Sequence, residues 1–155
     1  MDVNSLIGKI VLSSKFGIGT IVGVDDLGMS DKQFFVIESH QNRVKNFLPV
    51  DDDAHYRLVS SQEKFKEVFD DLKQSSQLPD FQSKQERINF FKDESKKQEI
   101  DLIASLVKML RDIEDKGSIE IQIFDRLIES LSMEYSIIYK TELEESKTLI
   151  EAQVS

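Results

Sequence analysis

Two stretches near the start of the chain, Ile7-Gly8-Lys9-Ile10-Val11 and Lys15-Phe16-Gly17-Ile18-Gly19-Thr20-Ile21-Val22, decide the fold of the N-terminal part. Apolar, mostly β-branched residues flank a Gly-x-Gly, and glycine adopts backbone angles that are barred to residues with side chains. The two stretches therefore predict two short strands joined by a tight glycine turn.

Three further strands are expected over residues 34–37, 43–50 and 56–59, because each is rich in the aromatic and apolar residues that strands favour. Five short strands within about 60 residues predict a small barrel of SH3 or Tudor type. The residues between these strands are mainly polar, as expected for turns.

The apolar period changes from strand-like to helical after the fifth strand. Residues 60–63 have the character of a capping box, and apolar residues then recur at helical spacing from Phe65 to Leu72. We expect this helix to close an open end of the barrel, so that residues 1–73 form one domain. Residues 74–80 are polar, serine-containing and end near a proline, and they are expected to be a linker.

Residues 81–155 keep an apolar period of about 3.6 residues, which predicts an all-helical domain. Helices are expected at about 81–92, 97–114, 119–139 and 142–153. The predicted fold class is therefore α+β with two domains, a small SH3/Tudor-like five-stranded β-barrel followed by a helical domain.

Composition restricts the function classes further. The chain has 20 basic and 29 acidic side chains, and its net charge of −9 argues against a general grip on nucleic-acid phosphates. The absence of cysteine excludes disulfides, cysteine-ligated zinc and thiol catalysis. No signal peptide and no apolar stretch of about 20 residues is recognised, so we expect a cytoplasmic protein with no membrane partner.

No side-chain pattern is typical of an enzyme. His40 and His55 have no nearby Ser/Asp partner pattern, and the Gly-x-Gly at 17–19 lacks the other residues of a phosphate-binding loop. The run 51–53 could hold a divalent cation, but an acidic turn is favoured, because calcium takes about six or more oxygen ligands. We therefore expect a non-enzymatic protein without catalytic residues, metal, cofactor or small-molecule substrate.

Five motifs of the N-terminal part occur in a distinctive order: Gly8-Lys9-x-Val11, Phe16-Gly17-Ile18-Gly19-x-Ile21, Phe34 to Ile37, Leu48-Pro49-Val50 and Tyr56-Arg57-Leu58-Val59. This order resembles the RNA polymerase-interacting domain of the CarD/CdnL/TRCF family. The resemblance implies a bacterial transcription regulator that binds the RNA polymerase β subunit and modulates the stability of the open promoter complex. It also implies association with the nucleoid through polymerase.

An incomplete barrel exposes an edge strand, whose unpaired backbone groups a partner strand can extend. The resemblance implies that this partner is a lobe of the polymerase β subunit. The candidate docking residues are Arg43, Val44, Lys45, Asn46 and Phe47. Phe47 stands where the family often has a basic residue.

The helical half also resembles the CarD-type C-terminal domain, in its helix count, its linker before an aromatic and basic first helix, and Gly117-Ser118 before a long helix. The resemblance implies a promoter contact in which Phe81 stands at the position of the family's wedge tryptophan. Basic residues outnumber acidic ones over 84–97, so DNA contact is expected there, weak and only alongside polymerase. The candidate DNA-binding residues are Phe81, Lys84, Arg87, Lys96 and Lys97.

One alternative stays open, a DNA-independent protein–protein adaptor with an acidic helical interaction module. An exposed apolar patch on the helical half, with Lys96 and Lys97 in intramolecular ion pairs, would favour the adaptor. A continuous basic stripe over 84–97 beside an exposed Phe81 would favour promoter contact.

Overall fold

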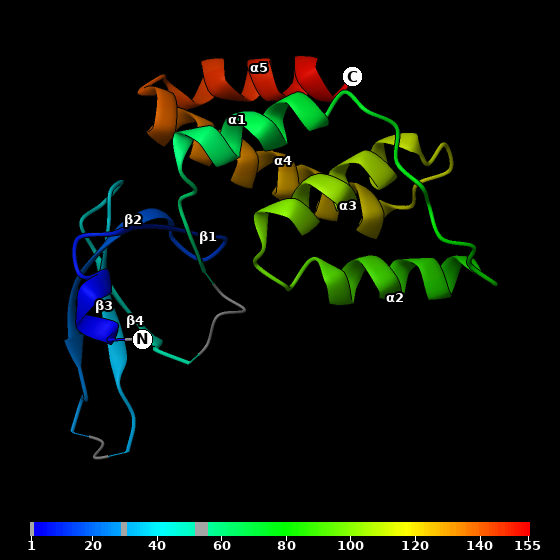
Figure 1. Ribbon diagram of the computed structural model, residues 1–155. Helices are drawn as coiled ribbons and strands as arrows, with labels where there is room; N and C mark the ends of the chain where they lie inside the picture. Colours follow the sequence, from blue (N-terminus) through cyan, green and yellow to red (C-terminus); the bar gives the residue numbers. More distant parts are fainter. Residues whose placement is uncertain (1, 29–30, 52–55) are drawn as a thin grey trace. The chain divides into compact units, whose positions relative to one another are not determined.

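The computed structural model describes residues 2–28, 31–51 and 56–155, which form two compact units, 1–59 and 60–155 (Figure 1). The first unit has a short 3-10 helix and five strands: η1 (Val3–Leu6), β1 (Ile10–Ser13), β2 (Gly17–Asp25), β3 (Phe34–Ser39), β4 (Lys45–Pro49) and β5 (Arg57–Leu58). The second unit has five helices: α1 (Gln62–Asp71), α2 (Lys84–Glu94), α3 (Ile100–Asp112), α4 (Ser118–Tyr139) and α5 (Leu143–Val154). The α+β class predicted from the sequence is confirmed.

The five strands form one antiparallel sheet in the order β4-β3-β2-β1-β5. Consecutive strands are neighbours except at β5, which pairs with β1. The sheet is not closed, since no pairing joins β4 to β5 among the described residues. Both strands are therefore edges of the sheet.

One face of the sheet forms the core of the first unit. Alternation along β3 buries Phe35 and Ile37, while Phe34 and Val36 are only half-buried on the other face. Phe35 packs edge-on against Tyr56, with ring centroids 5.9 Å apart. The period of two therefore sets which side chains reach the core and which stay on the outer face.

The predicted glycine turn lies elsewhere. Residues 14–16 form the turn, and Gly17, at φ +76°, is the first residue of β2. Gly19 lies inside β2 opposite Val11, where an added Cβ would be 2.6 Å from Cγ2 of Ile37. The second glycine is thus required by the close approach of a neighbouring side chain, and its interpretation as a turn residue is wrong.

Helix α1 belongs to the helical unit. Phe65, Val68 and Leu72 are buried in one core with residues of α2 to α5, and Phe65 lies edge-on to Tyr135, with ring centroids 6.1 Å apart. The N–H of Ser60, just before α1, donates to buried Glu134 of α4 at 2.6 Å. The expected use of this helix to close the barrel is therefore wrong, and the division falls at 59/60 rather than at 73/74.

The helix boundaries follow from their caps. Ser83 accepts from the N–H of Glu86 at 3.1 Å, so α2 begins at Lys84 rather than near residue 81. Ser61 caps α1 in the same way, accepting from the N–H of Lys64 at 3.1 Å. Within the described part of the chain, no helix is long and apolar enough to cross a membrane.

Candidate functional site

The free side of β4 is the candidate docking edge. Among the described residues, the strand pairs only with β3, in a register that places Lys45 opposite Glu38, Asn46 opposite Ile37 and Phe47 opposite Val36. An edge strand presents backbone groups without a ladder partner on its outer side.

Two backbone hydrogen bonds show which groups of β4 face outward. The N–H of Ser39 donates to the carbonyl of Val44 at 3.0 Å, and the N–H of Val50 donates to the carbonyl of Gln33 at 3.0 Å. Antiparallel ladders alternate, so residues 44, 46, 48 and 50 direct their backbone groups toward β3. The backbone groups of residues 45, 47 and 49 then face the free side.

Pro49 agrees with this assignment. Proline has no N–H and is tolerated in a strand where that position faces away from the ladder. The free edge therefore offers the backbone N–H groups of Lys45 and Phe47 as donors. It offers the carbonyl groups of Lys45, Phe47 and Pro49 as acceptors.

The side chains of β4 divide between the two faces of the sheet. Leu48 is in the core and Asn46 is half-buried on the same face, where its amide donates to the carbonyl of Val44 at 3.3 Å. Lys45 and Phe47 lie on the opposite, outer face, and Phe47 is 46% exposed. An exposed phenylalanine next to an open backbone edge is suited to contact a partner chain.

Arg43 and Val44 belong to the β3–β4 connection. Arg43 adopts a left-handed φ of +59°, and its N–H donates to the carbonyl of Ser39 at 2.9 Å. Its guanidinium lies 3.7 Å from Glu38 and its side chain is 85% exposed. Of the five residues expected to dock, the structure therefore places Lys45, Asn46 and Phe47 in the edge strand and leaves two before it.

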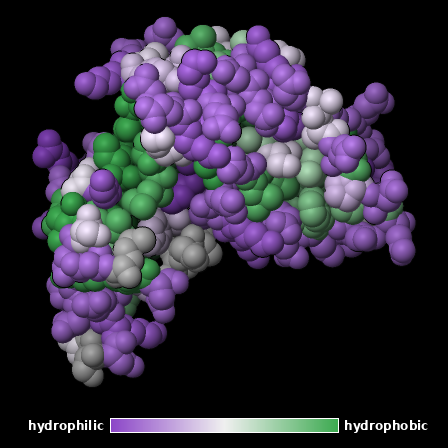
Figure 2. Space-filling view, viewed as in Figure 1, coloured by the Kyte–Doolittle hydropathy of each residue, from purple (hydrophilic) through white to green (hydrophobic). Residues whose placement is uncertain are grey.

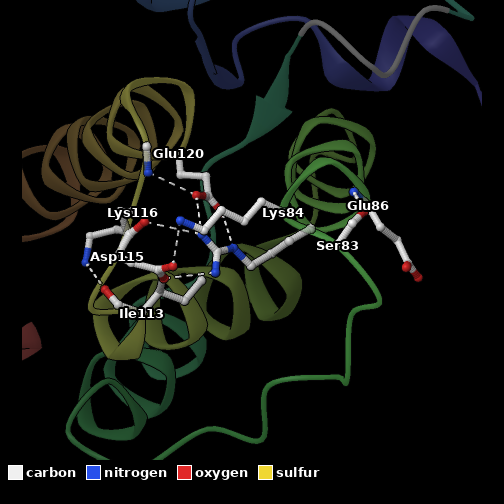
Figure 3. Close-up of polar contacts among 9 residues, drawn as sticks. Ser83, Lys84, Glu86, Ile113, Asp115, Lys116 and Glu120 are labelled. Carbon is white, nitrogen blue, oxygen red and sulfur yellow. Dashed lines mark hydrogen bonds and ion pairs between the residues drawn. The ribbon is translucent and has the colours of Figure 1, made fainter.

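Among the candidate DNA-binding residues, Arg87 is fully engaged inside the helical unit. Its Nε and Nη2 donate to the two carboxylate oxygens of Glu120 at 2.7 and 2.8 Å, and its Nη1 donates to Asp115 at 3.0 Å. The side chains of Arg87 and Glu120 are only 12% and 1% exposed. Figure 3 shows Asp115 and Glu120 gathered at the start of α4, with Lys84 reaching toward them from α2.

The electrostatics agree with a fixed cluster. The hydrogen bond from Arg87 lowers the pKa of the Glu120 carboxyl, with the backbone N–H of Gly117 also contributing. The same bond raises the pKa of Arg87. Hydrogen bonds from Lys84 and then Arg87 lower the pKa of Asp115. Arg87 thus links α2 to the start of α4 and is not available to a phosphate.

The remaining candidate DNA-binding residues are closer to the surface. Lys84 pairs with Asp115 at 3.1 Å and Lys97 with Glu94 at 2.9 Å, and both lysines, like Lys96, are exposed. Phe81 is half-buried and packs on Phe90 and Phe91 of α2, with ring centroids 5.3 and 6.3 Å away.

Promoter contact was expected to show a continuous basic stripe beside an exposed Phe81. Acidic partners interrupt the stripe, and Phe81 is held against its own domain. Sequence reasoning missed Asp115 and Glu120 because they lie about 30 residues away from the cations they neutralise, and helix packing alone brings them together. The face of the molecule seen in Figure 2 is mainly hydrophilic over the helices, with smaller hydrophobic areas.

The described residues contain no group of three or more His, Cys, Asp or Glu side chains that could hold a metal ion. His40 is hydrogen-bonded through Nε2 to Oγ1 of Thr20 at 2.7 Å. Asp52, Asp53 and His55 lie outside the described residues.

No protein-family model matches the chain, and no curated protein matches it significantly. The resemblance to the CarD/CdnL/TRCF family therefore rests on the order of the N-terminal motifs and, less specifically, on the pattern of the helical half.

Proposed function

We propose that this chain is a CarD-like transcription regulator that binds the RNA polymerase β subunit by adding a strand to the free edge of β4. The proposal depends mainly on one observation: the backbone groups of Lys45 and Phe47 point away from β3, on an edge strand. The unit that contains this strand also has the motif order of the family. In this proposal the sheet is an SH3/Tudor-like barrel left open at β4. The activity is binding without covalent chemistry, in the cytoplasm and on the nucleoid through polymerase.

The mechanism follows from the physics of strand addition. Main-chain hydrogen bonds supply affinity, and side chains beside them select the partner. Once the sheet unit is bound, the linked helical unit stays at a high effective concentration near the promoter, so even a weak second contact lengthens the lifetime of the open complex.

The lysines of the helical unit set the extent of DNA contact in this proposal. Exposed ion pairs are worth about 0–1 kcal/mol, so a phosphate can compete for Lys84 and Lys97, and Lys96 is exposed as well. Three contacts would give a slope of log affinity against log salt of about −3. Contact of this size matters only when polymerase tethers the protein.

The second candidate is the DNA-independent adaptor, and a specific observation favours it. Arg87 is occupied by Glu120 and Asp115, and Lys97 by Glu94, in a protein whose net charge is −9. In that case the helical unit contacts another protein, and DNA is never touched.

Binding of a purified polymerase β lobe to the full chain tests the edge. Lys45→Pro and Phe47→Pro each remove an outward amide and should abolish binding, while Lys45→Ala and Phe47→Ala keep the amide and serve as matched controls. Circular dichroism checks that each variant is folded. Undiminished binding by folded Phe47→Pro would place the interface elsewhere.

The lifetime of open promoter complexes separates the two candidates. A triple alanine variant of Lys84, Lys96 and Lys97 removes the exposed Lys84–Asp115 pair but keeps the bonds of Arg87 to Glu120 and Asp115, and it should shorten that lifetime if DNA is contacted. An unchanged lifetime with retained polymerase binding would favour the adaptor.

A further inference from the structure

The helical unit contains a groove that none of the candidate docking or DNA-binding residues lines. Helices α4 and α5 pack against each other, and their side chains form the groove together with the end of α3 and the α3–α4 connection. Its volume is about 550 Å³, within the range of about 300–1,000 Å³ that is usual for ligand sites. Arg111 of α3 also lines it but is already paired with Asp112 at 3.0 Å.

The floor of the groove is apolar. Ile128 of α4 and Val154 of α5 line it, and both belong to the buried core of the helical unit. Phe124 lines it as well and is only half-buried, although it packs against the same core. An apolar side chain placed on this floor would remove apolar surface from water on both sides of the contact.

Three cations border this floor without a carboxylate partner. The Nζ of Lys116 donates to the carbonyl of Ile113 at 2.7 Å and lies 5.9 Å from the centroid of the Phe124 ring. A carbonyl is neutral, so this bond fixes the ammonium group without cancelling its charge. Arg126 of α4 and Lys147 of α5 also line the groove, and neither pairs with any carboxylate that the structure describes.

Acidic side chains also line the groove, but they are mostly more exposed than the lysines. Asp125 and Glu151 are exposed, whereas Lys116, Lys147 and the third acidic residue, Glu129, are half-buried. Water weakens the interactions of exposed charges most. The interior of the groove therefore favours a negatively charged group, while its rim repels a long array of negative charge.

This arrangement distinguishes between classes of occupant. A nucleic-acid backbone presents closely spaced phosphates, which Asp125 and Glu151 at the rim repel, and the phosphates leave the apolar floor uncovered. An acidic protein segment can place an apolar side chain on the floor and single carboxylates on the lysines. A second copy of this chain is disfavoured, because each copy has a net charge of −9.

We infer that the groove between α4 and α5 binds a short segment of a partner protein in which an apolar residue is flanked by acidic residues. The apolar residue packs on Phe124, and the carboxylates pair with Lys116 and Lys147. Lys116 is already fixed by its bond to Ile113, so it loses little conformational freedom on binding. The inference concerns the helical unit and does not rest on polymerase binding by the sheet unit.

The test uses the full chain, isotopically labelled, and the capped peptide Gly-Ser-Glu-Leu-Glu-Ser-Gly. One control peptide has Ser in place of Leu, and the other has Lys in place of both Glu residues. We expect the first peptide to shift the amide signals of Phe124, Ile128 and Lys147. It should bind at least about tenfold more tightly than either control, because the controls lose the buried leucine or the charge pairing.

Variants of the chain test the cations. Lys147→Gln should weaken binding of the Glu-Leu-Glu peptide about three- to tenfold, since it removes the charge and keeps most of the side chain. Lys92→Gln is the matched control, because Lys92 is an exposed lysine of α2 that does not line the groove. It should leave the affinity unchanged. Circular dichroism checks that both variants are folded.

Equal affinity for the three peptides would overturn the inference, as would signal shifts confined to elements other than α4 and α5. A short DNA duplex that occupies the same residues more tightly than the peptide would assign the groove to nucleic acid instead. Concentration-dependent dimerisation that Lys147→Gln abolishes would assign it to a second copy. Phe47→Pro separates the inference from the proposed function, because it should abolish β-lobe binding and leave the peptide affinity unchanged.

Discussion

Replacing Arg87 by methionine should destabilise the helical unit strongly. The change removes the two hydrogen bonds from Arg87 to Glu120, at 2.7 and 2.8 Å. The Glu120 side chain is only 1% exposed, and the N–H of Gly117 is then the hydrogen-bond donor that its carboxylate keeps in this cluster. Removing one partner of a buried ion pair costs about 3–5 kcal/mol, because the other charge remains buried and uncompensated.

Lys84→Ala is the matched control. Lys84 lies in the same helix and contacts the same Asp115, at 3.1 Å, but its side chain is 71% exposed. Surface pairs of this kind contribute about 0–1 kcal/mol. The two variants thus differ in burial rather than in the type of charge that is lost.

Urea unfolding monitored by helical circular dichroism measures the difference. With an m-value of about 1.5 kcal/mol/M, Arg87→Met should lower the midpoint by about 2–3 M, and Lys84→Ala by less than about 0.7 M. The double variant Arg87→Met/Glu120→Gln should recover part of the loss, because the buried charge is then absent. Equal, small losses for Arg87→Met and Lys84→Ala would refute the buried cluster and would return Arg87 to the candidate DNA-binding residues.

Three further outcomes are expected. Gly19→Ala should destabilise the sheet unit by about 1–3 kcal/mol, because its Cβ would lie 2.6 Å from Cγ2 of buried Ile37. Gly23→Ala in the same strand should be tolerated, because a Cβ added there would meet no heavy atom within 4 Å. Thermal unfolding of the two variants measures the difference. Phe65→Ala should lower the unfolding free energy of the helical unit by about 3–5 kcal/mol and leave amide hydrogen exchange in the sheet unit unchanged. Increased exchange in β1 to β5 would contradict this and argue that α1 covers the sheet. The pKa of Glu120 is lowered in the folded state from its ordinary 4.5, so its contribution to stability is present above about pH 4.5 and is lost as the pH falls through the folded pKa. Measurements of the unfolding free energy at decreasing pH should show this loss. Glu120→Gln should reduce the dependence of the unfolding free energy on pH in this range.

The sequence by itself determined the elements and the fold class of this protein. Strand-like and helical periods are local properties, so they located five strands and the helices of the C-terminal half to within a few residues, and the α+β class followed from their order. The docking edge was named at 43–47 from the expectation of an incomplete barrel and the family resemblance, and the structure places 45–47 of this range in an edge strand.

Only the tertiary structure decided what packs against what. The apolar stripe of α1 fits a sheet or a helix bundle equally well, and contacts with α3, α4 and α5 settled the choice. The ladder direction at Val44 and Val50 identified Lys45 and Phe47 as the outward residues, which a list of five consecutive candidates cannot do. Arg87 reads as a free cation in the sequence, yet Glu120, 33 residues away, neutralises it in the folded chain. Hydrophobic period depends on neighbours along the chain, whereas burial, ladder direction and charge pairing depend on neighbours in space, and those are set only when the elements pack.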